Sequence, residues 1–139
     1  MQPIVHKSCG VILFIERASE IKFLLLKYPH GHIDFAKGHI EENETLIDCA
    51  KRELREETGI ADIELIEGFM EQINYNYIED NKQHYKTVDF FLAKSNTQNV
   101  TVSHEHTDFI WLNFASALDK LTFDNAKQLL IKAKSFLDL

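Results

Sequence analysis

Apolar residues in the first third of the chain form two runs that predict β-strands. The runs are 8–16 (SCGVILFIE) and 21–28 (IKFLLLKY), and the polar segment RASE separates them. Short apolar runs rich in Val, Ile, Leu and Phe and bounded by polar breaks are typical of strands. We therefore expect the fold to begin with two strands joined by a hairpin-type connection.

Further strands are predicted in the second half of the chain. Residues 63–66 form a short apolar segment, and 68–77 and 85–93 read as strands with the polar segment EDNKQH between them as a hairpin loop. Residues 109–112 suggest another short strand. Residues 29–38 (PHGHIDFAKG) are expected to form a loop, because they combine glycine, proline and ring residues without a period.

Two segments show the spacing of helices. The first is expected to run from Asn43 or Glu44 to Thr58, with Gly59 as a C-cap. The second spans 123–137, where apolar residues recur at helical spacing: Ala126, Leu129, Leu130, Ala133, Phe136 and Leu137. The order of strands, helix, strands and helix predicts an α/β or α+β sandwich, with a mixed sheet packed between helices.

Composition narrows the class of protein. The 139 residues fit one domain, 1–139, and a net charge of −7 argues against nucleic-acid or membrane surfaces as partners, since both favour basic patches. No segment approaches the length of a membrane span, and the N-terminal residues lack the apolar run of a signal peptide, so we expect a cytoplasmic protein. Cys9 and Cys49 lack metal-like spacing and are expected to be buried thiols.

The first predicted helix carries an unusual cluster of carboxylates, Glu53, Glu56 and Glu57. At about 100° per residue, with Glu53 at zero, Glu57 lies near 40° and Glu56 near 300°. The apolar arc of the same helix covers about 20–120° and contains Leu46, Ala50, Leu54 and Ile47. Glu53 and Glu57 are therefore predicted on or beside the face that packs on the protein, and a solvated face does not explain the pattern.

Carboxylates on a packed face need a partner. They lie near the C-terminal end of the helix, where the helix dipole disfavours anions, and burial would raise their pKa unless a cation is present. A hard divalent ion such as Mg²⁺ or Mn²⁺ takes oxygen ligands, and residues spaced i, i+3 and i+4 converge on one side. The spacing thus favours a metal site over a solvated charge cluster.

The segment GHIEENETLIDCAKRELREETGI, from Gly38 to Ile60, resembles the Nudix box at each of its fixed positions. These positions are Gly38, Glu44, Arg52-Glu53-Leu54, Glu56-Glu57 and Gly59-Ile60. The chain is identified on this basis as a member of the Nudix hydrolases. The resemblance implies an α/β/α sandwich with a mixed sheet, and Mg²⁺-dependent cleavage of a nucleoside diphosphate linked to another group, with water attacking a phosphorus.

The resemblance also implies roles for individual residues. Glu53, Glu56 and Glu57 match the metal-binding acids of the family, and the backbone carbonyl of Gly38 matches a further ligand. Glu44 and Arg52 match a structural pair that holds the loop on the helix and orients Glu53.

A narrower resemblance covers most of the chain. The segments KGHIEENE, EGFMEQINY, KTVDFFLAK, SHEHTDFIWL and LTFDNAKQLL are similar in order and spacing to the asymmetric diadenosine tetraphosphate (Ap4A) hydrolases of animals and archaea, which split Ap4A into ATP and AMP. Glu105 in SHEH would then be a further metal ligand or a base. The flanking His104 and His106 could bind metal, but they are more readily explained as solvated or capping residues.

The same resemblance implies a substrate site. Tyr75 and Phe123 would stack on a nucleobase, and Lys37 and Lys86 would contact phosphates, with assistance from His32 and His39. Tyr77 and Tyr85 are expected on the sheet surface, and Trp111 in the core. The expected partner is a small nucleotide, and the expected oligomeric state is a monomer.

Two residues depart from the pattern of these relatives. Their loop commonly reads Trp-x-x-Pro-Lys-Gly, whereas this chain has Ala36 in place of the proline and the acid Asp34 in place of a neutral residue. The substrate is therefore open to alternatives: RNA 5′ pyrophosphohydrolysis, nucleoside triphosphate or ADP-sugar pyrophosphatase activity, or nucleotide binding without catalysis.

Overall fold

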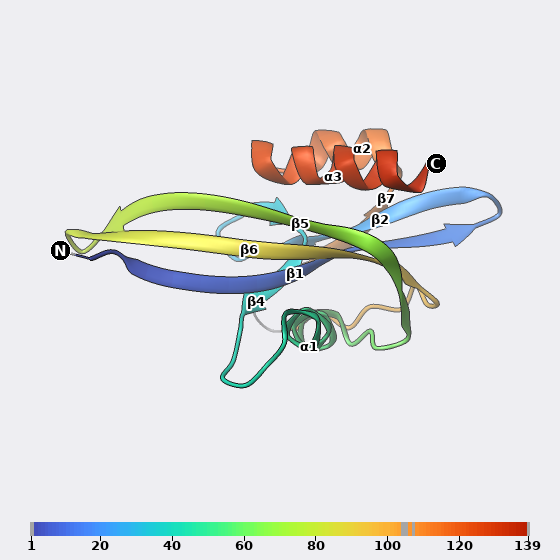
Figure 1. Ribbon diagram of the computed structural model, residues 1–139. Helices are drawn as coiled ribbons and strands as arrows, with labels where there is room; N and C mark the ends of the chain where they lie inside the picture. The colour runs from blue at the N-terminus through green and yellow to red at the C-terminus, as the bar shows by residue number, and fades with distance from the viewer. Residues whose placement is uncertain (1, 104–105, 107, 139) are drawn as a thin grey trace.

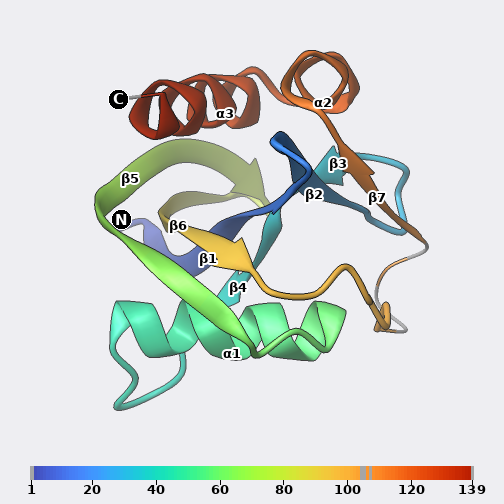
Figure 2. The same ribbon diagram turned by 90° about the vertical axis from the view of Figure 1, so that its right-hand side faces the viewer.

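The fold consists of three layers. The computed structural model describes residues 2–103, 106 and 108–138. A mixed, twisted sheet lies between α1 (Leu46–Thr58) on one face and α2 (Phe114–Lys120) with α3 (Asp124–Leu137) on the other (Figures 1 and 2). The predicted α/β/α sandwich is therefore confirmed.

The sheet has seven strands, and its central pair is parallel. The strands are β1 (Ile4–Arg17), β2 (Glu20–Lys27), β3 (Ile33–Asp34), β4 (Ala36–His39), β5 (Ile63–Glu79), β6 (Lys82–Ser95) and β7 (Asp108–Leu112). The main order is β3-β2-β1-β6-β5, while β4 pairs with β1 and β7 with β2. Among the strand pairs of the described residues, β1 and β6 run parallel and the others are antiparallel.

The long strand β1 divides one of its edges between two partners. Residues Phe14–Arg17 pair with β2, whereas Ser8–Val11 pair with β4. In this register Gly38 faces Cys9 and Lys37 faces Gly10. The segment just before the acid-bearing helix is therefore fixed in the sheet.

Two tight turns define the long hairpins. Ala18 and Ser19 join β1 to β2 with positive φ angles of 52° and 67°, and Asp80 and Asn81 join β5 to β6 with 55° and 60°. Two successive positive φ angles are typical of the turns that match the twist of a hairpin. The predicted hairpins are confirmed, with strands that extend further toward the turns than expected.

Helix α1 is capped at both ends. The Thr45 side chain accepts a hydrogen bond from the backbone N–H of Asp48, so the helix begins at Leu46, two or three residues later than predicted. Gly59 ends the helix in the left-handed conformation with φ of 76°, as expected. Ile47 in the first turn was predicted to be buried, which is wrong: it is 39% exposed.

Each face of the sheet carries its own core. The core under α2 and α3 includes the predicted stripe of α3, of which Ala126, Leu129, Leu130 and Ala133 are buried. The core under α1 contains both cysteines as free, fully buried thiols, as predicted. Burial raises the pKa of Cys9 well above its ordinary value, so this thiol stays protonated.

Several elements differ from the sequence-based expectation. The predicted loop 29–38 contains β3 and most of β4, because backbone pairing with β2 and β1 orders residues that show no strand pattern. The two predicted strands 63–66 and 68–77 are one strand, β5, with a register shift between Leu65 and Met70. Helix α2 was missed because it has seven residues and buries only Ala117.

Trp111 is half-buried against the core under α1, and its indole N–H donates to the carbonyl of Gln98 at 3.1 Å. Among the helices of the described residues, none has the length and apolar character needed to cross a membrane.

Candidate active site

The three carboxylates of α1 have different environments. Glu57 is buried at 3% exposure, the side chain of Glu53 is 14% exposed, and that of Glu56 is 55% exposed. The angular prediction that Glu53 and Glu57 lie on or beside the packed face of α1 is therefore confirmed, and Glu56 is exposed. Their roles as metal ligands stay a prediction.

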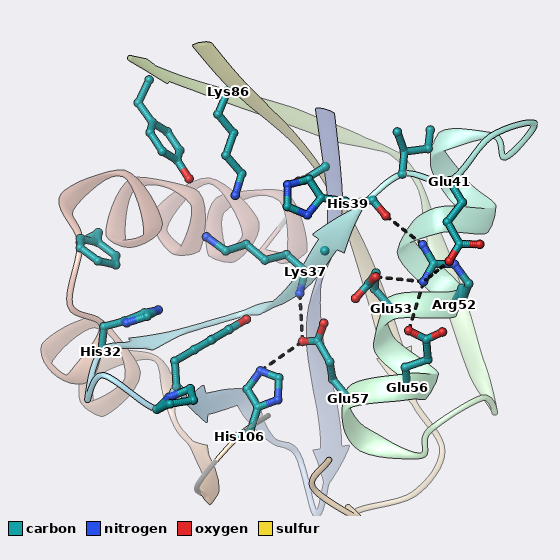
Figure 3. A pocket seen from close by; sticks show the side chains of 17 residues that line it. His32, Lys37, His39, Glu41, Arg52, Glu53, Glu56, Glu57, Lys86 and His106 are labelled. Atoms are coloured by element: carbon teal, nitrogen blue, oxygen red, sulfur yellow. Dashed lines mark hydrogen bonds and ion pairs between the residues drawn. The ribbon is translucent and has the colours of Figure 1, made fainter. Parts of the chain in front are cut away.

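Arg52 connects these acids to the loop that precedes the helix. Its Nε donates to Glu44 at 2.6 Å, and its Nη1 donates to Glu53 at 2.9 Å and to Glu56 at 3.1 Å. Its Nη2 also donates to the carbonyl of His39 at 2.9 Å. The hydrogen bond from Arg52 is the main reason why the pKa of Glu44 is lowered, and the same contact raises the pKa of Arg52. The predicted pair of Glu44 and Arg52 is thus in direct contact, and Figure 3 shows Arg52 among the acids.

Strand β4 brings backbone atoms to the same cluster. The N–H of Lys37 donates to Oε1 of Glu57 at 3.2 Å. A Cβ atom at Gly38 would lie 2.0 Å from the carboxylate carbon of Glu53, so only glycine lets this acid approach. The thiol of Cys49 donates to the carbonyl of Gly38 with a sulfur–oxygen distance of 3.7 Å.

Basic and aromatic side chains lie across the pocket from the acids. Nζ of Lys86 lies 5.9 Å from the centre of the Tyr75 ring, where an ammonium is attracted by the ring face. Burial, and then the nearby charge of Lys37, lower the pKa of Lys86. Burial also lowers the pKa of His32, whose ring stacks on Tyr28 at 4.6 Å between ring centres and lies 5.5 Å from Phe123.

A single pocket of about 750 Å³ joins the acids to these side chains. Every predicted site residue within the described ranges lines it except Glu44, which reaches it through Arg52. Figure 3 shows the lysines and His32 on one side of the pocket and the acids of α1 on the other. Of the predicted site residues, only Glu105 lies outside the described residues.

His106 is a site residue that the sequence reasoning did not select. It was expected to be solvated or capping, which is wrong: it is buried at 7% exposure, and its Nε2 lies 3.5 Å from Oε1 of Glu57. The ring meets Tyr28 edge-on at 4.4 Å, and its Nδ1 shares a hydrogen bond with Ser103 at 3.1 Å. Its position beside Glu105 in the SHEH segment was the only sequence signal.

The donor set fits a hard divalent ion. It offers the carboxylates of Glu53, Glu56 and Glu57 and the carbonyl of Gly38, all of them oxygen donors of the kind that Mg²⁺ or Mn²⁺ prefers. Within residues 2–103, 106 and 108–138, no three His, Cys, Asp or Glu side chains already converge as a metal-binding group. In this arrangement Glu53 and Glu56 both accept from Nη1 of Arg52, and Glu57 accepts from the N–H of Lys37.

Comparisons with known proteins agree with this geometry. The model of the NUDIX domain matches residues 5–132. The chain is 35% identical to asymmetrical bis(5′-nucleosyl)-tetraphosphatase from Mus musculus, over 94% of this chain and 95% of that protein. It is 32% identical to the protein of the same name from Caenorhabditis elegans, over 96% and 97%.

A solved structure gives the same result. A crystal structure of a C. elegans Ap4A hydrolase binary complex superposes with a TM-score of 0.85 at 30% identity, covering 96% of this chain and 98% of that one. The similarity therefore extends over nearly the whole chain in both sequence and fold.

Proposed function

Because the chain belongs to the NUDIX domain family, we propose that it hydrolyses Ap4A to ATP and AMP by attack of water on a phosphorus of the polyphosphate. The observation that carries the proposal is the single pocket of about 750 Å³ that holds acids, lysines and stacking rings together. The name of the C. elegans Ap4A hydrolase, whose solved structure superposes over nearly the full chain, supports Ap4A as the substrate. The relatives named bis(5′-nucleosyl)-tetraphosphatase support a dinucleoside tetraphosphate more broadly.

Proteins of this family with Ap4A hydrolase activity generally need a divalent metal. We propose Mg²⁺, with Mn²⁺ as a substitute, held by Glu53, Glu56, Glu57 and the carbonyl of Gly38. A bound ion of this kind offsets polyphosphate charge, aligns the phosphorus for attack and lowers the pKa of bound water. Glu105 is proposed as a further ligand or as the base.

The remaining residues of the acid cluster position these ligands. The 2.6 Å ion pair between Arg52 and Glu44 fixes the guanidinium against the loop before α1, and its Nη1 then directs the carboxylate of Glu53. The N–H of Lys37 fixes Oε1 of Glu57 in the same way. An acid fixed by such contacts loses little freedom when it binds a ligand.

The other side of the pocket receives the nucleotide in this proposal. The ammonium groups of Lys37 and Lys86 contact phosphate oxygens, and the rings of Tyr75 and Phe123 stack on one adenine. His32 adds a third ring beside Phe123, and its lowered pKa favours the neutral form that stacks without a charge. His39 is exposed at the edge of the pocket, where it assists with a phosphate.

We also propose that residues 1–139 form one domain that acts as a cytoplasmic monomer on a small nucleotide, without nucleic-acid or membrane partners. The net charge of −7 supports the lack of nucleic-acid and membrane partners, since both favour basic surfaces.

The function is tested by product analysis in ¹⁸O-labelled water. The purified protein is incubated with Mg²⁺ and, separately, Ap4A, a 5′-triphosphorylated short RNA, ADP-ribose and dGTP, and products are identified by mass. We expect ATP and AMP from Ap4A, with the label on AMP and slow turnover of the other compounds. Reactions with excess chelator serve as the control.

Other outcomes would contradict the proposal in different ways. Faster release of pyrophosphate from RNA or dGTP would keep the metal-dependent site and replace the substrate. Failure to turn over any of the compounds, while Mg²⁺ still binds, would favour a nucleotide-binding protein without catalysis.

A further inference from the structure

Asp34, the acid that departs from the pattern of the relatives, lines a narrow slot beside the main pocket. The slot has a volume of about 190 Å³, and its other walls are Lys37, Tyr75, Phe123 and Asn125. Asp34 is only 3% exposed. A buried carboxylate therefore lines the same slot as the two rings proposed to hold a nucleobase and the lysine proposed to hold a phosphate.

The orientation of this carboxylate is set by two contacts. Oδ1 accepts a hydrogen bond from the N–H of Phe35 at 2.7 Å, and Oδ2 forms an ion pair with Nζ of Lys37 at 3.0 Å. A carboxylate offers about four lone-pair positions, so each oxygen retains capacity for one more donor. In both of these contacts the carboxylate is the acceptor, and an ionised carboxylate only accepts hydrogen bonds.

Asp34 lines the same slot as Tyr75 and Phe123, so a nucleobase held by these two rings would lie with an edge near its carboxylate. A base edge with an N–H group can donate a hydrogen bond to the carboxylate. A base edge with a carbonyl oxygen cannot, and its oxygen would repel the carboxylate oxygens. Adenine carries an amino group at position six, and hypoxanthine carries a carbonyl at the same place. The two bases otherwise have nearly the same shape and stacking surface.

We propose that Asp34 determines base specificity by accepting a hydrogen bond from the exocyclic amino group of adenine. The inference rests on the proposed function, since it assumes that the nucleotide binds with its base between Tyr75 and Phe123. Adenine can make this hydrogen bond to the charged carboxylate, and hypoxanthine cannot. The loss of one such hydrogen bond corresponds to a preference for adenine of about 10- to 100-fold. Lys37 supports this role by holding the carboxylate in place before the base arrives.

The experiment compares kcat/KM for Ap4A and diinosine tetraphosphate on each of three proteins: the wild type, Asp34→Asn and Asp124→Asn. Asp124 is an exposed acid next to Phe123, so its replacement removes the same charge without changing the slot. We expect the wild type and Asp124→Asn to prefer Ap4A by about 10- to 100-fold. In Asp34→Asn the ratio should fall toward one, because an amide can donate to the carbonyl of hypoxanthine.

The ratio separates recognition from structural damage. A variant that is only less well folded loses activity toward both substrates, and the ratio stays unchanged. Asp34→Asn keeps an oxygen for the N–H of Phe35, and Asp34→Thr provides a second neutral variant if the first has a lowered melting temperature. Equal kcat/KM for both substrates in the wild type, or an unchanged ratio in a folded Asp34 variant, would overturn the inference.

Failure of the proposed function gives a different result. If the wild type hydrolyses neither dinucleotide, the binding of ATP and ITP is compared by calorimetry on the same three proteins. Tighter binding of ATP that is lost only in Asp34→Asn would support the base contact in a protein that does not hydrolyse Ap4A. Equal binding of the two nucleotides by the wild type would overturn it.

Discussion

Gly38 and Glu53 approach each other so closely that no side chain fits between them. A Cβ atom built on Gly38 would lie 2.0 Å from the carboxylate carbon of Glu53. The atoms that it would meet belong to the far end of a flexible side chain, so a substitution displaces the acid and leaves the backbone in place. The position of Glu53 in the acid cluster thus requires a residue without a side chain at position 38.

The first prediction follows from this contact. Gly38→Ala should lower kcat/KM by about 100-fold, because a misplaced catalytic group is costly even when the displacement is near 1 Å. Circular dichroism and melting temperature should change little. Adding Glu53→Asp, which shortens the acid by one methylene group, should recover part of the activity; a double variant no better than the single one would mean that the strand, and not the acid, has moved.

Glu57→Gln should lower kcat by several orders of magnitude and leave the fold intact. The amide retains an oxygen that can accept from the N–H of Lys37, yet it lacks the charge that a divalent ion requires. Steady-state kinetics and the Mn²⁺ dissociation constant should both be measured. Near-normal turnover by a folded variant would remove Glu57 from the metal site.

Tyr75→Ala should raise KM for dinucleotide substrates roughly tenfold, which is the range expected for one lost stacking contact. The effect on kcat should be smaller, because stacking contributes equally to the bound substrate and to the transition state. Tyr77→Ala is the matched control: its ring centre lies 6.3 Å from that of Tyr75, and it does not line the pocket. Equal effects of the two substitutions would argue for a general disturbance of β5.

The activity should fall at a lower alkaline pH than expected for a lysine with an ordinary pKa. Burial and the charge of Lys37 lower the pKa of Lys86 below the usual 10.5, so its ammonium is lost at lower pH. The alkaline limb of kcat/KM, which reports on the free enzyme, should therefore begin below pH 10.5 and move upward in Lys86→Arg. Lys82→Arg, an exposed lysine at the start of β6, should leave the limb unchanged.

The Glu44–Arg52 pair should make stability depend on pH in the acid range. The hydrogen bond from Arg52 lowers the pKa of Glu44 below its ordinary 4.5, and a carboxyl with a depressed pKa adds stability above its unfolded-state pKa. That contribution is lost as pH falls through the lower, folded-state value. The melting temperature of Glu44→Gln should thus be below that of the wild type at pH 7, and the gap should close below pH 4.5.

The control for this prediction is Glu41→Gln. Glu41 is 66% exposed and lies 3.5 Å from Arg52, so its charge should contribute little to stability. A pH-independent gap between the wild type and Glu44→Gln would show that Glu44 stabilises the loop by packing and not by its charge.

The parts of the site that follow from local sequence were predictable, and the parts set by distant contacts were not. Helical angles placed Glu53 and Glu57 on the packed side of α1, because those positions depend only on residues within the same helix. The same helical angles predicted that Ile47 is buried, which is wrong, because this residue in the first turn of α1 is exposed. The contact between Lys37 and Glu57 required β4 to pair with β1, which no periodicity in 29–38 indicated.

His106 illustrates the same limit. Its burial depends on Tyr28 from the other end of the sequence, which packs against the ring edge-on. A lone histidine in a polar segment carries no signal of such a contact. Asp34 was visible as an unusual residue, but its ion pair with Lys37 and its place in the slot became apparent only from the arrangement of β3, β4 and α3.

The parallel pairing of β1 with β6 has a consequence for synthesis on the ribosome. His6 and His84, which share a hydrogen bond across these strands, are 78 positions apart. The ribosome synthesises the acids of α1 long before it synthesises β6. Strand β4, which contacts these acids, pairs with β1, and the other edge of β1 stays unpaired until β6 has been made. Contacts between residues so distant in sequence form slowly. We therefore expect the nascent chain to contain all the acids of α1 for some time before the active-site pocket has folded.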